Sequence, residues 1–394
     1  MMSKSESDRS LEIADRVESF VRDVVIPQER DPRCGAHGPT EAFVAELRAQ
    51  ARAHGVLTPH ILADGTHLTQ RETATVLKRS GLSPLGPVAV NTAAPDEGNM
   101  FLIGKIGTPQ QKRRFLAPLI AGARSAFFMT EPAAEGGAGS DPSLLQTTAR
   151  REGDHWVIDG RKAFITGAQG ASVGIVMARS RVEGARVHAT MFLVELPHPA
   201  IRIVRVLDTI DSSMPGGHAL IDIEGLRVPS DQVLGEVDEG FKYAQVRLAP
   251  ARLSHCMRWH GAAMRAHDIA TAYATTRHAF GKLLIDHEGV GFMLADNQIA
   301  LTQSSLMIDW CADALDAGSA GTSESSVAKV AVSELLYGVA DRCVQVMGGT
   351  GVSRETVVEQ IFREIRAFRI YDGPTEVHKW SIAKAIKRAA LIPK

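Results

Sequence analysis

The stretch Arg369-Ile-Tyr-Asp-Gly-Pro-Thr-Glu-Val-His378 places an acidic residue in a glycine turn near the end of the chain. Asp372 follows two large apolar residues and precedes a Gly-Pro pair, a combination that ends a helix and holds the backbone open. A carboxylate in such a turn is well placed to act as a base. An isolated Asp-Gly pair more often caps a following helix, which would begin here near Thr375. Other segments of the chain, described below, favour the interpretation of Asp372 as a base over that of a helix cap.

The bulk composition is that of an ordinary soluble enzyme. The 394 residues include 44 basic and 45 acidic side chains, and the formal net charge of -1 suggests neither a nucleic-acid partner nor a membrane-surface partner. The four cysteines form no CxxC pair, which favours a reduced cytoplasmic protein. The polar, acidic N-terminal segment lacks the apolar core of a signal peptide, and no run of about eighteen apolar residues predicts a membrane span.

Three parts of the chain differ in texture and together predict an α+β fold. Residues 1–124 show a helical period and predict an N-terminal helical domain. Residues 125–236 predict a middle β-barrel or sandwich, because short β-branched runs alternate there with glycine and turn residues. The helical period returns in residues 237–394, where long helices joined by short glycine-rich turns predict an antiparallel bundle.

Particular runs carry these expectations. The first helical stripe consists of Leu11, Ala14, Val17, Val21 and Val24. The expected strands cover residues 155–160, 163–166, 173–177, 189–194 and 201–206. The stripe of the long C-terminal helix consists of Val290, Met293, Leu294, Leu301 and Ile308.

Four segments together resemble the acyl-CoA dehydrogenase family of flavoproteins, whose catalytic carboxylate lies in an Ile-Tyr-Glu-Gly-Thr turn. The segments are FFMTEP with the following GGAGSD (127–141), TTRHAFGKLLIDHE (275–288), VQVMGGTGVS (344–353) and the turn at Asp372. Their order and approximate spacing match the family across essentially all 394 residues. The resemblance implies the family's architecture of a helical domain, a β domain and a C-terminal four-helix bundle, in agreement with the three textures.

The resemblance also implies an activity, the FAD-dependent formation of the 2,3-double bond of an acyl-CoA thioester. Asp372 is then the general base, and the flavin accepts the hydride, which no protein side chain can do. The expected electron acceptor is an electron-transferring flavoprotein, and the expected assembly is a homodimer or homotetramer with FAD at the subunit interface. The residues expected to contact the substrate are Ser140, Arg252, Tyr371 and Gly373.

Two groups of FAD-binding residues follow from the same resemblance. No GxGxxG loop follows a strand, so the barrel edge is expected to hold the flavin through Met129, Thr130, Ser140, Phe164, Ile165 and Thr166. A neighbouring subunit is expected to reach the pyrophosphate and adenine through Arg277, Phe280, His287, Gln345 and Gly349, with Glu376 as a further cofactor contact. A guanidinium suits phosphate oxygens well.

The sequence departs from the family pattern at several positions. Asp372 stands where a longer glutamate is usual, and Phe164 stands where a tryptophan packs on the flavin. Pro374 replaces a flavin-contacting threonine and supplies no N–H, and an insertion lies between Pro132 and Gly139. Residues 94–100, 249–258 and 372–378 resemble one branch that carries an aspartate base and includes members fused to an aminoglycoside-phosphotransferase-like kinase domain. That branch suggests long, branched, 4-hydroxy or 4-phosphorylated acyl chains.

Other functions stay open at this stage. A nitroalkane-oxidase-like flavoprotein would also use Asp372 as a base, and a non-catalytic family member would keep the fold without the chemistry. Two SxxK sequences, Ser326–Lys329 and Ser381–Lys384, hint at a serine acyltransferase, but no KTG triplet accompanies them. The spacings of the 14 histidines, among them His255 and His260, form no ligand set, so no metal is expected.

Overall fold

The computed structural model describes residues 4–184 and 186–391, which belong to two compact units. The helical unit comprises the described parts of Met1–Arg30, Leu62–Pro87 and Ala249–Lys394, and the sheet unit comprises Asp31–Ile61 and Val88–Leu248. The sequence-based boundaries near residues 124 and 236 divide the chain by texture rather than by contacts, and they remain predictions. None of the described helices is long and apolar enough to cross a membrane.

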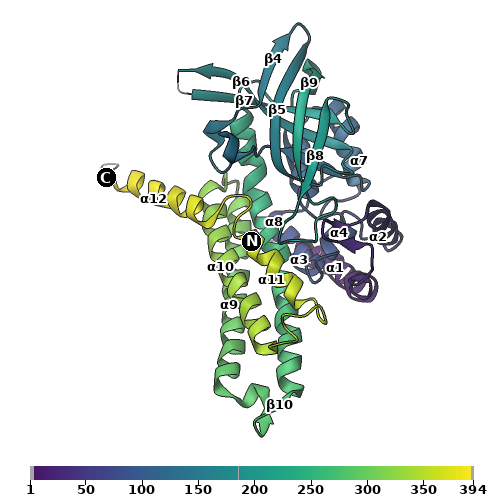
Figure 1. The fold of residues 1–394 in the computed structure, drawn as a ribbon, viewed down its shortest axis with the longest axis vertical. Coiled ribbons are helices and arrows are strands. Elements are labelled where there is room, and N and C mark those ends of the chain that lie inside the picture. Colours follow the sequence, from purple (N-terminus) through teal and green to yellow (C-terminus); the bar gives the residue numbers. More distant parts are fainter. Residues whose placement is uncertain (1–3, 185, 392–394) are drawn as a thin grey trace. The chain divides into compact units, whose positions relative to one another are not determined.

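A seven-stranded sheet, counted over the described residues, forms the centre of the sheet unit (Figure 1). Its strand order is β3-β6-β4-β5-β9-β8, and β7 pairs with β6 off this path. The β3–β6 pair is parallel, whereas β4–β5, β5–β9, β6–β7 and β8–β9 are antiparallel. The strands are β3 (Ser125–Phe128), β4 (Thr148–Glu152), β5 (His155–Thr166), β6 (Val173–Glu183), β7 (Arg186–Glu195), β8 (Ile201–Leu207) and β9 (His218–Pro229).

The sheet is packed on both faces, as β6 shows most clearly. Ile175 and Met177 join one hydrophobic cluster, and the intervening Val176 and Ala178 join another. Because successive side chains of a strand point to opposite faces, a strand buried on both faces has a nearly continuous apolar sequence. The sequence predicted a strand at residues 173–177 from their β-branched, apolar run.

Short helices accompany the sheet within its unit. The N-terminal part contains α2 (Glu41–Ala53), α5 (Asp96–Ile106), α6 (Pro109–Gln111), α7 (Ala117–Ile120) and the small hairpin of β1 (Cys34–Gly35) and β2 (Gly38–Pro39). Leu102 of α5 and Phe115, on the π-helical turn Lys112–Leu116, are fully buried in the same cluster as Ile175. The first helical texture therefore contributes to the sheet unit as well as to the helical unit.

Long helices dominate the helical unit (Figure 1). α9 packs against α10, which in turn contacts α11 and α12, while α1 packs against α3. The helices are α1 (Lys4–Phe20), α3 (Gln70–Ser80), α8 (Gly240–Thr276, in this unit from Ala249), α9 (Glu288–Asp316), α10 (Thr322–Met347), α11 (Val358–Phe368) and α12 (Thr375–Leu391). The hairpin of β10 (His278–Ala279) and β11 (Lys282–Leu283) follows α8, and α4 (Gly86–Ala89) lies where the chain passes between units. The predicted fold class, helical parts flanking a middle β domain, is confirmed.

The predicted apolar stripe of the first helix is wrong at two positions. Leu11 is exposed and Val24 is half-buried, whereas Val25 is fully buried. The shift from Val24 to Val25 has a local cause, because α1 passes into a π-helical turn at Val21–Val25, which takes more residues per turn and moves the buried face along the chain. At the start of the helix, Ser10 rather than Leu11 is buried.

Two positions of the helical unit, Pro250 and Gly81, have a structure that the local sequence does not predict. α8 continues through Pro250, although proline supplies no N–H and disfavours helical geometry in the residue before it. At Gly81, which caps α3, an added Cβ atom would lie 2.0 Å from the carbonyl oxygen of Arg258 in α8, so the two backbones approach too closely for any side chain.

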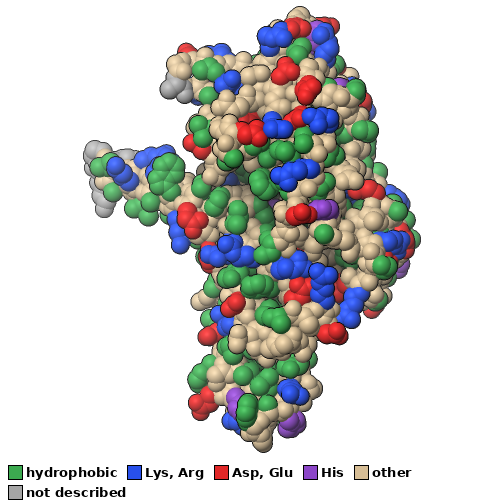
Figure 2. Space-filling model, viewed as in Figure 1, with side chains coloured by type: hydrophobic (Ala, Val, Ile, Leu, Met, Phe, Trp, Pro, Cys, Tyr) green, Lys and Arg blue, Asp and Glu red, His purple; other side chains and the backbone are tan. Residues whose placement is uncertain are grey.

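The surface is mixed in charge. Figure 2 shows Lys and Arg side chains interspersed with Asp and Glu over the visible face, in keeping with the formal net charge of -1.

Candidate active site

Asp372 lies in the turn between α11 and α12, where the sequence predicted a break in the helix. Its φ angle is 52°, in the left-handed region, and Gly373 follows with a φ angle of 103°. A short polar residue such as aspartate tolerates this conformation better than a longer side chain does. This preference gives a physical reason for aspartate, rather than glutamate, at this position of this chain. The side chain is 23% exposed, so the carboxylate lies neither in the core nor in open solvent.

The backbone of the turn is held by donors from three helices. The carbonyl oxygen of Asp372 accepts a hydrogen bond from Nε of Arg252 in α8 at 3.0 Å and lies 3.1 Å from Nε2 of His378 in α12. The carbonyl oxygen of Gly373 accepts a hydrogen bond from Nζ of Lys329 in α10 at 2.8 Å. A Cβ atom at Gly373 would lie 2.5 Å from the His378 ring, so both its conformation and its space favour glycine. Arg252, a predicted substrate contact, thus lies beside the turn that carries Asp372.

The Ser326–Lys329 motif takes part in the same arrangement. Lys329 holds the turn, and Oγ of Ser326 lies 3.1 Å from Nδ1 of His378. Oγ of Ser326 also lies 2.8 Å from the carbonyl oxygen of Thr322 within α10. Both side chains of the motif therefore support the turn that carries Asp372, directly or through His378.

Burial shapes the charges around the turn. Burial lowers the pKa of Lys329 to about 8, against the opposing effect of nearby acidic groups, among them Asp372. It also lowers the pKa of Arg252, which Asp372 partly offsets. For His378, burial together with the charges of Arg252 and Lys329 lowers the pKa to about 4. At neutral pH, His378 is therefore uncharged, and the cations Arg252 and Lys329 lie beside the backbone of the turn.

His255 is a further neighbour of Asp372. Its Nε2 lies 3.3 Å from Oδ2 of Asp372, and its ring lies 4.7 Å from the ring of Tyr371. Nε1 of Trp259 donates to the hydroxyl oxygen of Tyr371. The other ring nitrogen of His255, Nδ1, lies 3.2 Å from Nη2 of Arg258. Tyr371, a predicted substrate contact, thus packs on the histidine that touches the predicted base.

The predicted flavin contacts of the sheet unit lie next to one another. Met129 and Thr130 follow β3, and Phe164, Ile165 and Thr166 end β5. The backbone N–H of Ala163 donates to the carbonyl oxygen of Thr130 at 2.9 Å, which joins the two segments. Ser140 is exposed in the loop that follows Thr130.

The exposure of the Phe164 ring indicates whether the residues around it could bind a flavin. Phe164 has a φ angle of 56° and is 60% exposed, while Ile165 beside it is buried in the core. Phe164 is therefore not a residue of the hydrophobic core. An exposed ring flanked by the hydroxyls of Thr130 and Thr166 fits a flat, largely apolar group with polar edges, such as a flavin. The Thr166 hydroxyl lies 2.8 Å from Nδ1 of His218, which fixes its direction.

A buried ion pair anchors the inserted loop. Glu131 receives the Lys162 ammonium at 2.9 Å and the backbone N–H groups of Ala138, Gln146 and Thr147 at 3.3, 2.6 and 2.9 Å. Burial lowers the pKa of Lys162 to about 8, against the opposing charge of Glu131. Burial also raises the pKa of Glu131, but Lys162 and the backbone donors outweigh it and hold this pKa below its usual range. The loop between Pro132 and Gly139 is therefore tied to β5 at its base.

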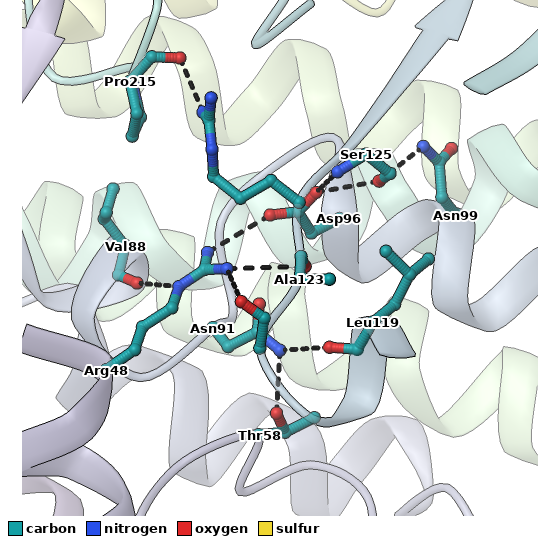
Figure 3. A network of polar contacts seen from close by, with 12 residues as sticks. Arg48, Thr58, Val88, Asn91, Asp96, Asn99, Leu119, Ala123, Ser125 and Pro215 are labelled. Atoms are coloured by element: carbon teal, nitrogen blue, oxygen red, sulfur yellow. Dashed lines mark hydrogen bonds and ion pairs between the residues drawn. The ribbon is translucent and has the colours of Figure 1, made fainter. Parts of the chain in front are cut away.

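A second buried network fixes the start of β3 (Figure 3). Asp96 accepts hydrogen bonds from the backbone N–H and the hydroxyl of Ser125 at 2.6 and 2.8 Å and pairs with Arg48 at 3.2 Å. Arg48 also donates to the carbonyl oxygen of Val88, and Asn99 donates to the Ser125 hydroxyl. A small cavity beside the network is lined by Arg48, Ala94, Asp96, Arg124, Ser125 and Thr166, among others. The network sets the direction of β3, and thereby the position of Thr130.

The second predicted group of cofactor contacts lies in the helical unit. Arg277 is exposed at the end of α8, and Phe280, in the hairpin after it, is 97% exposed with a φ angle of 51°. Phe280 stacks edge-on against His287 at 6.1 Å. Gln345 and Gly349 are exposed at the end of α10, and Glu376 is exposed at the start of α12. An exposed guanidinium beside an exposed aromatic ring suits the phosphate and base of a nucleotide.

Comparisons with known proteins agree with this arrangement. The family model "Acyl-CoA dehydrogenase, middle domain" matches residues 126–214, and "Acyl-CoA dehydrogenase, C-terminal domain" matches residues 238–387. The chain belongs to the acyl-CoA dehydrogenase family. Membership of this family makes the protein an oxidoreductase of the acyl-CoA dehydrogenase class, and the family's members are flavoproteins.

Individual relatives within the acyl-CoA dehydrogenase family are similar over nearly the whole chain. FadE2 of Mycobacterium tuberculosis, described as a probable acyl-CoA dehydrogenase, is 35% identical over 96% of this chain and 95% of its own. Acyl-CoA dehydrogenase family member 11 of Gallus gallus is 33% identical over 96% of this chain, which spans 50% of that protein. A structure from Mycobacterium abscessus assigned to the acyl-CoA dehydrogenases has a TM-score of 0.87 and 33% identity, covering 98% of this chain and 99% of its own. The glutaryl-CoA dehydrogenase of Mycobacterium smegmatis, solved in complex with FADH2, shares the fold with a TM-score of 0.84 at 23% identity, covering 100% of this chain and 97% of its own.

Sequence reasoning about this acyl-CoA dehydrogenase missed the neighbours of Asp372 on α8. It treated His255 only as a metal-ligand candidate, and the described residues contain no group of three or more side chains that could hold a metal ion. The available signal was spacing, because Arg252, His255 and Trp259 recur at helical intervals and are all buried. Polar residues on a buried helix face require partners, and these three find theirs in the turn at residues 371 and 372.

Proposed function

We propose that this acyl-CoA dehydrogenase uses FAD to oxidise an acyl-CoA thioester to the 2,3-enoyl-CoA, with Asp372 as the general base. The observation that carries the proposal is the construction of the turn. Its carbonyl oxygens are held by Arg252, Lys329 and His378, so the carboxylate is presented from a fixed backbone while remaining partly exposed. Preorganisation of this kind is what proton transfer from carbon requires.

Each part of the chain has a proposed role in the reaction. Asp372 removes the proton from the carbon next to the thioester carbonyl, and the bound flavin supplies the acceptor for the hydride. Phe164 and Thr166 of the sheet unit would hold the flavin ring, and Arg277 and Phe280 of the helical unit would bind the dinucleotide of a neighbouring subunit. Their exposure in a single chain supports a homodimer or homotetramer in which a partner covers them.

Further proposals concern the acyl chain of the substrate, the electron acceptor and the cellular location. Resemblance to the branch with an aspartate base suggests long, branched, 4-hydroxy or 4-phosphorylated acyl chains, and an electron-transferring flavoprotein is the proposed electron acceptor. The chain spans half of the length of its Gallus gallus relative, so what the remainder of that protein does is not carried over. The four cysteines, all of them described, form no disulfide, which fits the proposed reducing cytoplasm.

Anaerobic titration of the yellow protein tests the proposal. Straight, branched and 4-hydroxy acyl-CoAs are added in turn, and the loss of flavin colour reports the reductive half-reaction. We expect Asp372→Asn to slow this reduction by about 100-fold to 10,000-fold, the usual contribution of a general base, with FAD binding retained. Asp268→Asn is the matched control, since that side chain is exposed on α8.

Three outcomes would contradict the proposal. Flavin reduction at an undiminished rate in Asp372→Asn would assign the base to another residue. Reduction by nitroethane in place of acyl-CoA would identify a nitroalkane oxidase. A protein that takes up no FAD would be a non-catalytic family member.

A further inference from the structure

We propose that His255 is a positioning residue, which donates its Nε2–H to the Asp372 carboxylate and is held in the required tautomer by Arg258. The inference rests on the proposed function, because it assigns His255 a task only if Asp372 is the base. It concerns a side chain that the sequence did not connect with the site.

The tautomer follows from the partner of the other ring nitrogen. Nδ1 of His255 lies 3.2 Å from Nη2 of Arg258, and an arginine can only donate hydrogen bonds. Nδ1 must therefore be the acceptor, and in a neutral imidazole the single proton is then on Nε2. Nε2 lies 3.3 Å from Oδ2 of Asp372, so the proton points at the carboxylate.

Arg258 also opposes a charged imidazole. A second proton on Nδ1 would face the N–H of the guanidinium, which cannot be deprotonated. His255 is 4% exposed, and its ring contacts Phe368 at 6.0 Å and Tyr371 at 4.7 Å. A neutral donor fixes the direction of the carboxylate while leaving it more basic than an ion pair would.

The remaining groups around the turn act on its backbone or lie further along the helices. The titratable and charged neighbours are Arg252 and Arg258 from α8, Lys329 from α10, His378 from α12, and Tyr371 from the turn itself. The pKa of His378 is lowered to about 4 by burial and by nearby cations, and that of Lys329 to about 8 by burial. Between about pH 5 and about pH 7, one unit inside both values, the charges of the two groups change little, so rate changes there report mainly on the pair of Asp372 and His255.

The test compares four variants of the FAD-loaded protein with octanoyl-CoA as the probe. Stopped-flow reduction of the flavin is followed between about pH 5 and about pH 7, where the charges of His378 and Lys329 change little. His255→Leu removes the donor, and His255→Gln keeps an N–H at a similar reach. His260→Gln is the matched control, since His260 is an equally buried histidine of α8 that contacts Ser304 instead. Asp372→Asn reports separately on the base.

We expect His255→Leu to lower the plateau rate by about tenfold to 100-fold, the equivalent of one hydrogen bond to a charged group. Its acid limb should move to higher pH by about one to two units, because the charged carboxylate loses a donor. His255→Gln should recover most of the rate and of the limb position. If His255 had only a structural role, His255→Leu and His255→Gln would not differ in this way in plateau rate and in the pH of the acid limb.

A second measurement does not depend on turnover. In protein labelled with ¹⁵N-histidine and assigned through His255→Gln, the His255 ring should show a protonated Nε2 and an unprotonated Nδ1 at neutral pH. A protonated Nδ1, or a His255→Leu profile equal to that of His260→Gln, would overturn the inference while leaving the proposed function intact. Undiminished flavin reduction in Asp372→Asn would remove the proposed function itself.

Discussion

Replacing Lys162 with methionine should destabilise the sheet unit by about 3 kcal/mol at pH 7. Lys162 is fully buried, and its ammonium lies 2.9 Å from Glu131 and 2.8 Å from the carbonyl oxygen of Met177. Removing one partner of a buried pair costs roughly 3–5 kcal/mol, because the other charge stays buried without compensation. We take the lower end of that range because three backbone N–H groups still solvate Glu131. Methionine fills a similar volume, so a cavity adds little.

The loss should depend on pH with a defined sign. In the wild type, the pKa of Glu131 in the folded state lies below its unfolded value, so its contribution is present above the unfolded value of about 4.3 and is lost as the pH falls through the folded value. In Lys162→Met the cation that lowers this pKa is gone, and burial then favours the protonated acid. The difference between the two proteins should therefore be largest near neutral pH and shrink towards about pH 4.

Urea unfolding followed by circular dichroism measures the difference, at one protein and one FAD concentration. Lys242→Met is the matched control, because Lys242 faces Glu239 at 3.8 Å on the surface and its side chain is 62% exposed. That exposed pair should contribute no more than about 1 kcal/mol. Equal losses in the two variants, or a loss at Lys162 that does not change with pH, would refute the argument from buried charge.

Three further substitutions test the helical unit by its free energy of unfolding. Gly81→Ala should cost about 1–3 kcal/mol or more, since the new Cβ atom would lie 2.0 Å from the Arg258 carbonyl oxygen. Gly289→Ala, where nothing lies within 4 Å, should instead be neutral or stabilising by up to about 1 kcal/mol, and the reverse order of the two melting temperatures would contradict the packing. Thr69→Ala should cost about 1 kcal/mol, because Thr69 forms a capping box with Glu72 at the start of α3. A loss in urea unfolding below about 0.3 kcal/mol would show that the cap contributes little.

Much of the sheet was predictable from local patterns, and the exceptions have physical causes. The runs at 155–166, 173–177, 189–194 and 201–206 all lie in strands, although the expected break near residue 161 is a pair of register shifts inside the continuous β5. β9 was missed despite alternating burial at Ile221 and Ile223. The length of α8 could not be predicted, because Pro250 normally ends a helix and only the packed unit overrides it.

Part of the candidate site was likewise predictable from local sequence, and part was not. The turn at Asp372 was predictable because Gly-Pro chemistry is local. The contact between Asp372 and His255 joins residues more than a hundred positions apart, and no local period encodes it. The directions of Arg252 and Lys329 were equally hidden, since both reach backbone oxygens, which carry no sequence signal.

Because Arg252, Lys329 and His378 grip main-chain oxygens, the scaffold of the turn does not depend on which side chain residue 372 carries. The backbone contacts that hold the turn and the side chain of residue 372 can therefore change separately in evolution. A lineage could exchange the aspartate for another short polar side chain that tolerates the left-handed conformation of residue 372, without rebuilding the loop. For the same reason, residue 372 is a position at which a protein engineer could introduce another short reactive side chain.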